Sequence, residues 1–353
     1  MPTRVAINGF RRIGRSVLRS AYERSVDLDI VAINDVADPG TLAHLLKFDS
    51  VFGRFPGTIE CDGDALRVDG REIRVLSERD PGSLPWADLE VDVVIESTGR
   101  FRTRADAERH LQAGARKVIL SAPSKGSDPV DANVVLGVNF HEVYDPDAHD
   151  IITNASCTTN CLAPVAKVLH EAVGISHGQM TTIHAYTSDQ SLLDGPHKDL
   201  RRARAAAINL VPTSTGAASA LGLVIPELAG RLNGIAVRAP VPTGSIVDLT
   251  IESERPTDAG EINTIFRERA YTGKMAGILA YSDEPIVSTD IVKSPYSSVF
   301  DSLLTSVVGG TQVKVVAWYD NEWGSANRLV ELAALVLEPQ RVPPLSVPSA
   351  TTR

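Results

Sequence analysis

The start of the chain constrains its fold more than any other segment. Residues 4–8 read as a buried strand, Gly9 follows, and residues 12–25 carry the apolar spacing of an amphipathic helix. The next apolar run, residues 30–34, reads as a second strand and is followed by Asp35. Strand, helix and strand form one βαβ unit, which predicts a parallel sheet with a helix crossing over it.

The loop between the first strand and its helix has nearly the spacing of a dinucleotide-binding motif. Gly9 permits a tight turn, Gly14 permits close packing of helix on strand, and the helix N-terminus accepts a pyrophosphate. Asp35, at the end of the second strand, would bind ribose hydroxyls and repel a 2′-phosphate. We therefore expect NAD as the cofactor, in preference to NADP.

Position 11 departs from that motif. The middle glycine normally lets the backbone approach the phosphates, and here it is Arg11. A side chain there should clash unless the loop shifts, although its guanidinium would also be able to pair with a phosphate. We expect NAD binding to be kept. The alternative is a chain that no longer uses NAD well.

The remaining elements predict an α/β fold with two different sheets. Apolar runs at residues 66–68, 73–76, 91–96 and 117–120 predict strands, with a helix at 103–113 and a hairpin turn at residues 69–70. Their alternation predicts a doubly wound, largely parallel sheet of the Rossmann type. Later strands, at residues 179–185, 234–238, 245–252 and 311–319, have fewer helices between them. They predict a second, α+β catalytic domain with a mostly antiparallel sheet.

These patterns predict two domains and a tail. We expect an NAD-binding domain over residues 1–155, completed by a C-terminal helix at about 323–338, and a catalytic domain over residues 156–322. Residues 339–353 contain four prolines and end in small polar residues, which is typical of a mobile tail.

The segment from residue 154 to residue 161 holds the most reactive candidate side chain. Ser156 is a good N-cap for the helical pattern that follows, so Cys157 lies in the first turn of a helix. The unpaired N–H groups and the helix dipole stabilise a thiolate there, and they also offer donors to an oxyanion. Cys157 is therefore a nucleophile or a buried small residue, and this position favours the nucleophile.

Composition excludes several classes of function. The chain has three cysteines, and no second Cys/His pair at zinc spacing follows Cys157 and Cys161, so we expect no metal. An odd, sparse cysteine count argues against a secreted disulfide scaffold. The net charge of −9 gives no support to nucleic-acid binding, and no apolar stretch is long enough to span a bilayer. We expect a cytoplasmic protein with neither a nucleic-acid nor a membrane partner.

Several motifs in order resemble the glyceraldehyde-3-phosphate dehydrogenase family, of the phosphorylating, NAD-linked, bacterial type. The resemblance is carried by residues 5–10, 155–161, 182–187, 196–207, 212–218, 238–245 and 318–324. It covers nearly the whole chain, and only residues 127–131 and 339–353 look like additions. It implies the glycolytic oxidation of glyceraldehyde 3-phosphate with NAD and phosphate to 1,3-bisphosphoglycerate and NADH.

The resemblance also implies a role for individual residues. Cys157 is the nucleophile that forms a thiohemiacetal and then a thioester, and His184 is its base, which as a cation would hold the thiolate. A lone histidine on a strand is otherwise most often a core residue. The positions that match the family's substrate- and phosphate-binding residues are Ser156, Thr158, Thr187, Arg202, Thr215, Gly216 and Arg238. The positions that match its cofactor contacts are Arg12, Ile13, Asp35, Arg79, Ser121 and Asn321.

The family resemblance further implies a homotetramer, in which the segment around Arg202 approaches a neighbouring subunit's cofactor. Pro196 agrees with Asp35 in favouring NAD, whereas Ser325 stands where the family usually has an aromatic residue. Two alternatives stay open. One is an erythrose-4-phosphate dehydrogenase, although that branch lacks two of the motifs present here. The other is a specialised inhibitor-tolerant or regulatory paralogue with weakened NAD use.

Overall fold

The computed structural model describes residues 2–340. The chain forms two compact units. Within the described residues, the first consists of residues 2–134, Phe140–Ala155 and residues 325–340, and the second of Val135–Asn139 and Ser156–Gly324. No helix within residues 2–340 is long and apolar enough to cross a membrane. Of the predicted tail, residues 341–353 lie outside the described residues.

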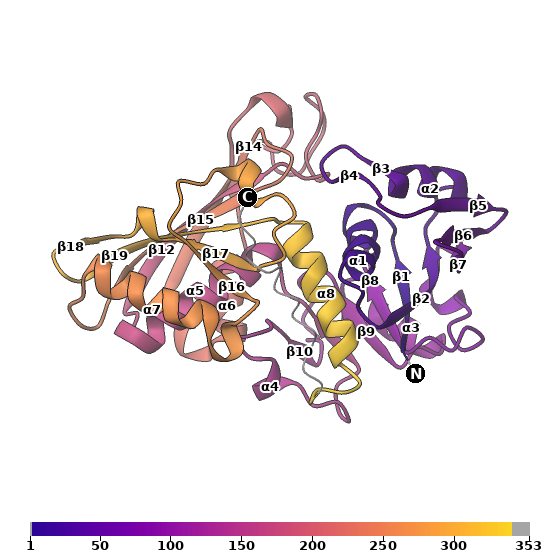
Figure 1. The fold of residues 1–353 in the computed structure, drawn as a ribbon, viewed down its shortest axis with the longest axis horizontal. Coiled ribbons are helices and arrows are strands. Elements are labelled where there is room, and N and C mark those ends of the chain that lie inside the picture. The colour runs from indigo at the N-terminus through magenta and orange to yellow at the C-terminus, as the bar shows by residue number, and fades with distance from the viewer. Residues whose placement is uncertain (1, 341–353) are drawn as a thin grey trace. The chain divides into compact units, whose positions relative to one another are not determined.

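The first unit is built on a nine-stranded sheet (Figure 1). Seven strands pair in parallel, in the order β10 (Ala132–Asn133), β11 (Ile151–Thr153), β9 (Lys117–Leu120), β8 (Val93–Glu96), β1 (Thr3–Asn8), β2 (Leu28–Asn34) and β7 (Arg71–Leu76). Two antiparallel strands, β6 (Ala65–Val68) and β5 (Ile59–Asp62), continue that edge. A short hairpin of β3 (Phe48–Asp49) and β4 (Gly53–Arg54) stands apart from it.

Helices cross between these strands in two directions. Helix α1 (Arg12–Glu23) leads from β1 to β2, and α3 (Arg104–Gln112) leads from β8 to β9 on the other side of β1. Right-handed crossovers in opposite directions place the two helices on opposite faces of the sheet. The order therefore reverses between β1 and β8, which is where doubly wound sheets bind their ligands. The other helices are α2 (Pro39–Lys47), α4 (Phe140–Val143) and α8 (Trp323–Leu335).

The structure confirms the predicted fold class and shows where local signals were strong. Asp69 and Gly70 both have positive φ, 47° and 78°, as a two-residue hairpin turn requires. Helix α3 begins after Thr103, whose side chain forms a capping box with Asp106. Helix α2 was not predicted, although Asp38 caps it by accepting from Thr41 N at 2.9 Å, a signal that the sequence did contain.

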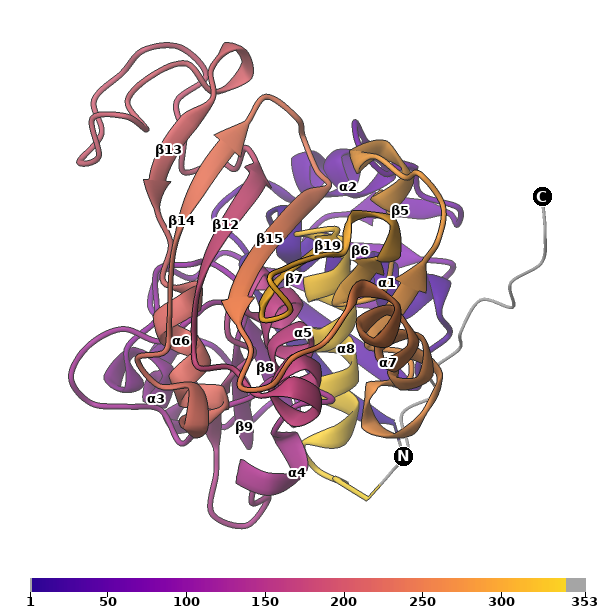
Figure 2. The same ribbon diagram turned by 90° about the vertical axis from the view of Figure 1, so that its left-hand side faces the viewer.

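The second unit is built on an eight-stranded, mostly antiparallel sheet (Figure 2). Its strands follow the order β13 (Val211–Ser214), β14 (Leu232–Ala239), β12 (His177–Ala185), β15 (Ser245–Glu252), β19 (Gln312–Tyr319), β17 (Ser298–Asp301) and β16 (Leu279–Ser282), and β18 (Ser306–Val308) also pairs with β19. Only β12 with β14 and β16 with β17 are parallel.

One face of this sheet is covered by α5 (Cys157–Val173), α6 (Ala217–Val224) and α7 (Ala259–Tyr271) (Figure 1). The covered face is apolar, as the stacked rings of Phe266 and Phe300 illustrate, with centroids 3.9 Å apart. The parallel register of β12 and β14 sets His184 beside Arg238 near the carboxyl ends of both strands. That pairing positions the candidate site.

Candidate active site

Helix α5 presents Cys157 as the sequence predicts. Ser156 is the N-cap and its hydroxyl accepts from Thr159 N at 3.0 Å, so Cys157 is the first residue of the helix. The chain reaches the cap through Ala155, which has a left-handed φ of 53°. Such strain in a residue with a β-carbon is found mostly where a site has to be held in one geometry.

The structure brings His184 to this thiol. Its Nε2 lies 3.4 Å from Cys157 Sγ, and the residue is 5% exposed, near the end of β12. Its Nδ1 lies 2.6 Å from the carbonyl oxygen of Ala185. With the proton on Nδ1, that hydrogen bond forms and Nε2 is the acceptor that faces the thiol. With the proton on Nε2, Nδ1 instead accepts from Arg238 Nη1, which lies 2.5 Å away. A base at His184 requires the first tautomer. Tyr319 packs edge-on against the ring, with centroids 5.8 Å apart.

The electrostatics of this pair differ from the expected thiolate and imidazolium. Burial raises the pKa of the Cys157 thiol, although the nearby charge of Arg238 works against that rise. Burial and the same arginine lower the pKa of His184 to about 3. Burial is the larger cause, and the arginine adds to it because Arg238 Nη1 lies 2.5 Å from His184 Nδ1. Without a ligand, the structure therefore favours a neutral thiol beside a neutral imidazole.

Three of the predicted phosphate-binding residues meet next to this pair, on the carboxylate of Asp189. Arg202 Nη1 lies 2.6 Å from Asp189 Oδ2, and Thr187 donates its hydroxyl to the same carboxylate. Arg238 Nη2 lies 4.0 Å from Asp189 Oδ2. Burial opposes ionisation of Asp189, but the Thr187 hydroxyl and the two arginines hold the pKa of its carboxyl below the ordinary value. The cluster is thus ionic at neutral pH.

The other predicted anion-binding residues lie at helix starts. Thr215 accepts from Ala217 N at 3.2 Å, and Gly216 is the N-cap of α6 without a capping side chain. The hydroxyl of Ser156 is engaged in its own cap. Thr158 differs from the expectation, because it is buried and its hydroxyl bonds Tyr319 Oη at 2.9 Å. Its side chain is not available to an anion in this geometry.

Sequence reasoning missed Asp189 and Tyr319 as members of the site. Tyr319 Oη bonds both Thr158 and Thr182, each at 2.9 Å, and so ties the start of α5 to β12. Asp189 lies two residues after Thr187 in an irregular segment. No periodic pattern marks either residue, because each acts through contacts that only folding creates.

The first unit places the glycine loop at the carboxyl end of β1, beside the switch point. Gly9 has a φ of 93°, and a β-carbon there would meet Thr98 N at 2.6 Å. A β-carbon on Gly14 would meet the Gly9 carbonyl oxygen at 2.2 Å. Both glycines are therefore required by backbone packing. Arg11 is exposed with a φ of −85°, so a side chain at this position causes no backbone strain.

Five of the predicted cofactor residues belong to this edge of the sheet. Arg12 and Ile13 open α1, and no side chain caps that helix. Asp35, Arg79 and Ser121 follow β2, β7 and β9. Asp35 accepts from Phe10 N at 2.8 Å, which fixes its carboxylate against the loop. The guanidinium of Arg12 is paired with Asp49. An uncapped helix start and a fixed acid suit a dinucleotide's pyrophosphate and ribose.

Asn321, the sixth predicted cofactor residue, belongs to the second unit. It is 5% exposed, and its Oδ1 accepts from Ser245 Oγ at 3.0 Å, which fixes the orientation of the amide. Ser325 is buried, and its hydroxyl has no partner among the described residues. The structure gives no account of the serine at that position.

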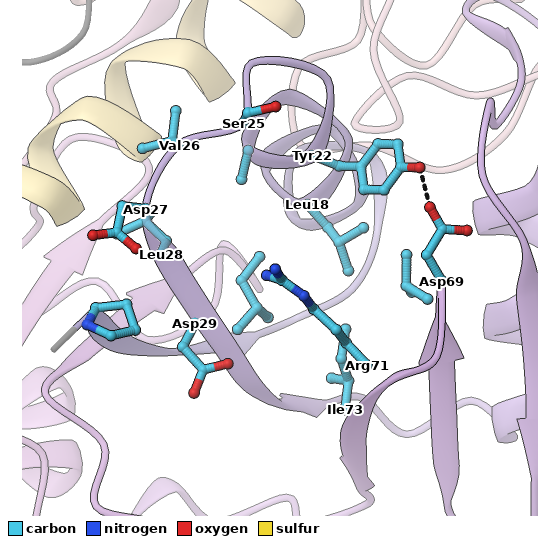
Figure 3. A pocket seen from close by; sticks show the side chains of 14 residues that line it. Leu18, Tyr22, Ser25, Val26, Asp27, Leu28, Asp29, Asp69, Arg71 and Ile73 are labelled. Atoms are coloured by element: carbon cyan, nitrogen blue, oxygen red, sulfur yellow. Dashed lines mark hydrogen bonds between the residues drawn. The ribbon is translucent and has the colours of Figure 1, made fainter.

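A separate pocket of about 840 Å³ lies at the opposite end of the same strands (Figure 3). Leu28 and Asp29 at the start of β2, and Arg71 at the start of β7, line it. Tyr22 donates to Asp69 across its rim. Dinucleotides bind at the carboxyl ends of such strands, so this pocket is not the candidate cofactor site.

Comparisons with known proteins match both parts of the chain. Residues 3–104 match the family model described as glyceraldehyde 3-phosphate dehydrogenase, NAD binding domain, and residues 156–321 match that of the C-terminal domain. The chain is 59% identical to glyceraldehyde-3-phosphate dehydrogenase 2 of Streptomyces arenae over 336 residues. The match covers 95% of this chain and 99% of that protein. Identity to the glyceraldehyde-3-phosphate dehydrogenase of Geobacillus stearothermophilus is 55%, and the match covers 95% of this chain and 98% of that protein. Identity to the glyceraldehyde-3-phosphate dehydrogenase of Mycobacterium avium is 56%, and the match covers 95% of this chain and 99% of that protein.

Proposed function

The chain belongs to the glyceraldehyde-3-phosphate dehydrogenase family, and from that premise we propose which residues carry the reaction. The protein is an NAD-dependent oxidoreductase that acts on glyceraldehyde 3-phosphate and phosphate. The contact between Cys157 Sγ and His184 Nε2, 3.4 Å, is the single observation that supports the assignment of roles within it.

Cys157 is the nucleophile in this proposal. His184 Nε2 accepts the thiol proton while Sγ forms a bond to the aldehyde carbon. The imidazolium then returns that proton to the carbonyl oxygen, which completes a thiohemiacetal and leaves His184 neutral. The free amides at the start of α5 stabilise the developing oxyanion. The C–H electron pair of the thiohemiacetal then leaves as a hydride and its hydroxyl proton passes to His184, which leaves a thioester on Cys157. When bound, NAD supplies the hydride acceptor for this oxidation.

Phosphate completes the reaction. An oxygen of inorganic phosphate attacks the thioester carbon, the C–S bond breaks, and the product leaves as an acyl phosphate. Two anions must be held during this cycle. Thr187, Arg202 and Arg238 form one cluster of donors, which we assign to the substrate phosphate. The helix starts at Ser156 and at Thr215–Gly216 offer a second set of donors for inorganic phosphate.

The cofactor residues are proposed at the edge formed by the glycine loop. Arg12 and Ile13 at the start of α1 would hold the pyrophosphate, Asp35 the ribose hydroxyls, and Arg79 and Ser121 the remaining part of the nucleotide. Asn321 would bind the nicotinamide carboxamide through its oriented amide.

A homotetramer in the cytoplasm is part of the proposal. The segment between β12 and β13, which carries Arg202, exposes five large apolar side chains at 68–81% of their surface: Leu192, Leu193, Leu200, Ile208 and Leu210. Exposed apolar side chains in such density indicate a surface that another protein covers. A second copy of this chain is the partner that the family resemblance supplies.

The alternatives are less well supported. The relatives are glyceraldehyde-3-phosphate dehydrogenases over nearly their whole length, which does not favour an erythrose-4-phosphate dehydrogenase. A paralogue with weakened NAD use was suggested by Arg11 and Ser325, and the same relatives do not favour it. The exposed side chain and ordinary φ of Arg11 show only that this residue does not strain the loop.

The test is turnover with glyceraldehyde 3-phosphate, NAD and phosphate, compared with erythrose 4-phosphate and unphosphorylated glyceraldehyde. We expect steady NADH formation only when phosphate is present. Without phosphate we expect a burst of NADH and an acyl group on Cys157, detected by mass spectrometry. Steady turnover without phosphate, or acylation at another residue, would contradict the proposed roles. Light scattering of the purified protein tests the tetramer.

A further inference from the structure

Asp189 occupies the place where the proposed function requires a substrate phosphate. Arg202, Arg238 and Thr187 are the residues proposed to bind that phosphate, and all three face the Asp189 carboxylate. A carboxylate and a phosphate present the same kind of charged oxygen acceptors to guanidinium and hydroxyl donors. In the ligand-free structure, this carboxylate therefore does what a bound phosphate would do.

The charges of the cluster support competition between the two anions. Two guanidinium groups, of Arg202 and Arg238, are matched by two carboxylates, of Asp189 and Asp199, which lies 3.5 Å from Arg202 Nε. This set has no net charge to offer a phosphate dianion. If Asp189 rotates into water, the cluster gains one positive charge and the donors of both arginines become accessible.

The two arginine side chains are more buried than the Asp189 carboxylate, which lies on the solvent side of the cluster. Their side chains are 20% and 13% exposed, and Arg238 stands on β14. Asp189 follows the end of β12 in a turn, and its side chain is 41% exposed. Arg238 contacts this carboxylate only weakly, because Arg238 Nη2 lies 4.0 Å from Asp189 Oδ2. The buried Nε of Arg238 has no hydrogen-bond partner among the described residues. The Arg238 guanidinium therefore keeps hydrogen-bond donors that Asp189 does not satisfy.

We propose that Asp189 is a built-in competitor for the substrate-phosphate position, which rests on the proposed function of these residues. Its carboxylate neutralises the cluster until a phosphate-bearing substrate displaces it. Small inorganic anions such as sulfate or chloride bind the cluster weakly, because each has to displace this carboxylate. Asp189 thereby lowers the affinity of the cluster for every anion. A phosphate ester substrate overcomes this competition because the contacts of its aldehyde end add to those of its phosphate.

The experiment is a calorimetric titration of sulfate into the ligand-free protein and into Asp189→Asn. Asparagine keeps the size of the side chain and an acceptor for Thr187 but removes the charge. We expect sulfate to bind Asp189→Asn roughly tenfold more tightly, because a charge-assisted contact no longer has to be broken. The KM for glyceraldehyde 3-phosphate should fall in parallel, and by a larger factor than the KM for unphosphorylated glyceraldehyde.

Asp199→Asn is the matched control. Asp199 also faces Arg202 and bonds Thr213, but it contacts neither Thr187 nor Arg238 in the described structure. Equal tightening in both variants would mean that any lost negative charge suffices, which contradicts displacement at one position. Unchanged or weaker sulfate binding by Asp189→Asn would instead make Asp189 a scaffold for the arginines. Because sulfate binding needs no turnover, failure of this proposal is separate from failure of the proposed reaction.

Discussion

The two candidate sites in this chain depend on different groups, one on the main chain and the other on side chains. At the glycine loop of the first unit, the decisive features belong to the main chain: a left-handed Gly9, a packed Gly14 and an uncapped helix start. Around Cys157 in the second unit, they belong to side chains that hold one another, from His184 to Arg238 and Asp189. A main-chain site tolerates changes of exposed side chains, whereas a side-chain network is sensitive to every member. Four substitutions test this contrast.

Cys157→Ser should have the largest effect. Serine keeps the size of the residue and the helix start, but it has no ionisable group near neutral pH, so acylation should fall by several orders of magnitude. NAD affinity should be unchanged, because the glycine loop is untouched. Single-turnover NADH formation and NAD titration measure the two quantities. A variant that loses NAD binding as well would show that the thiol helps to build the cofactor site.

His184→Asn should reduce the first-turnover rate by roughly 10²–10⁴-fold, the usual contribution of a general base. The remaining rate comes from the thiol and the amides of α5. Since burial already raises the pKa of the Cys157 thiol, loss of the neighbouring acceptor should also slow thiol alkylation at neutral pH. Alkylation rates equal to those of the parent protein would rule out a proton acceptor at His184.

Gly9→Ala tests the main-chain site. The added β-carbon would meet Thr98 N at 2.6 Å at a φ of 93°, so we expect a loss of stability greater than the roughly 1–3 kcal/mol of backbone strain alone, together with loss of NAD binding. Gly63→Ala is the control, because Gly63 has a φ of 59° but open space around it. It should cost only about 1–2 kcal/mol and leave NAD affinity intact. Urea unfolding and NAD titration distinguish them, and equal losses would mean that close packing at Gly9 does not matter.

Arg11→Gly should have the smallest effect. Arg11 is exposed, and an exposed charge contributes about 0–1 kcal/mol, so NAD affinity should change by less than about fivefold. We expect the parent's affinity to fall as salt rises and the variant's affinity to fall less steeply, because salt screens a guanidinium near the pyrophosphate. Calorimetric titration of NAD at low and high ionic strength measures both slopes. A large change would show that this side chain belongs to the main-chain site.

Local sequence signals predicted the frame of both sites. The spacing of Gly9, Gly14 and Asp35 predicted a βαβ unit with its loop at the carboxyl end of β1, and the structure has that unit. Ser156 predicted the start of α5 and thus the position of Cys157. These signals are readable because each depends on residues within one or two turns of the chain. The roles given to these residues remain predictions.

Only the tertiary structure decided the chemistry around the thiol. His184 meets Cys157 through the packing of α5 on the sheet, and Arg238 meets His184 through the register of β12 and β14. Burial raises the pKa of the Cys157 thiol and lowers the pKa of His184, and the arginine lowers the pKa of His184 further. The ligand-free site therefore favours a neutral pair in place of the expected thiolate and imidazolium. Asp189 joins the cluster from an irregular segment that no pattern marks. Distance, register and burial are properties of the folded chain. The sequence alone therefore determined which side chains were present, and the fold determined which of them meet and which charge each one carries.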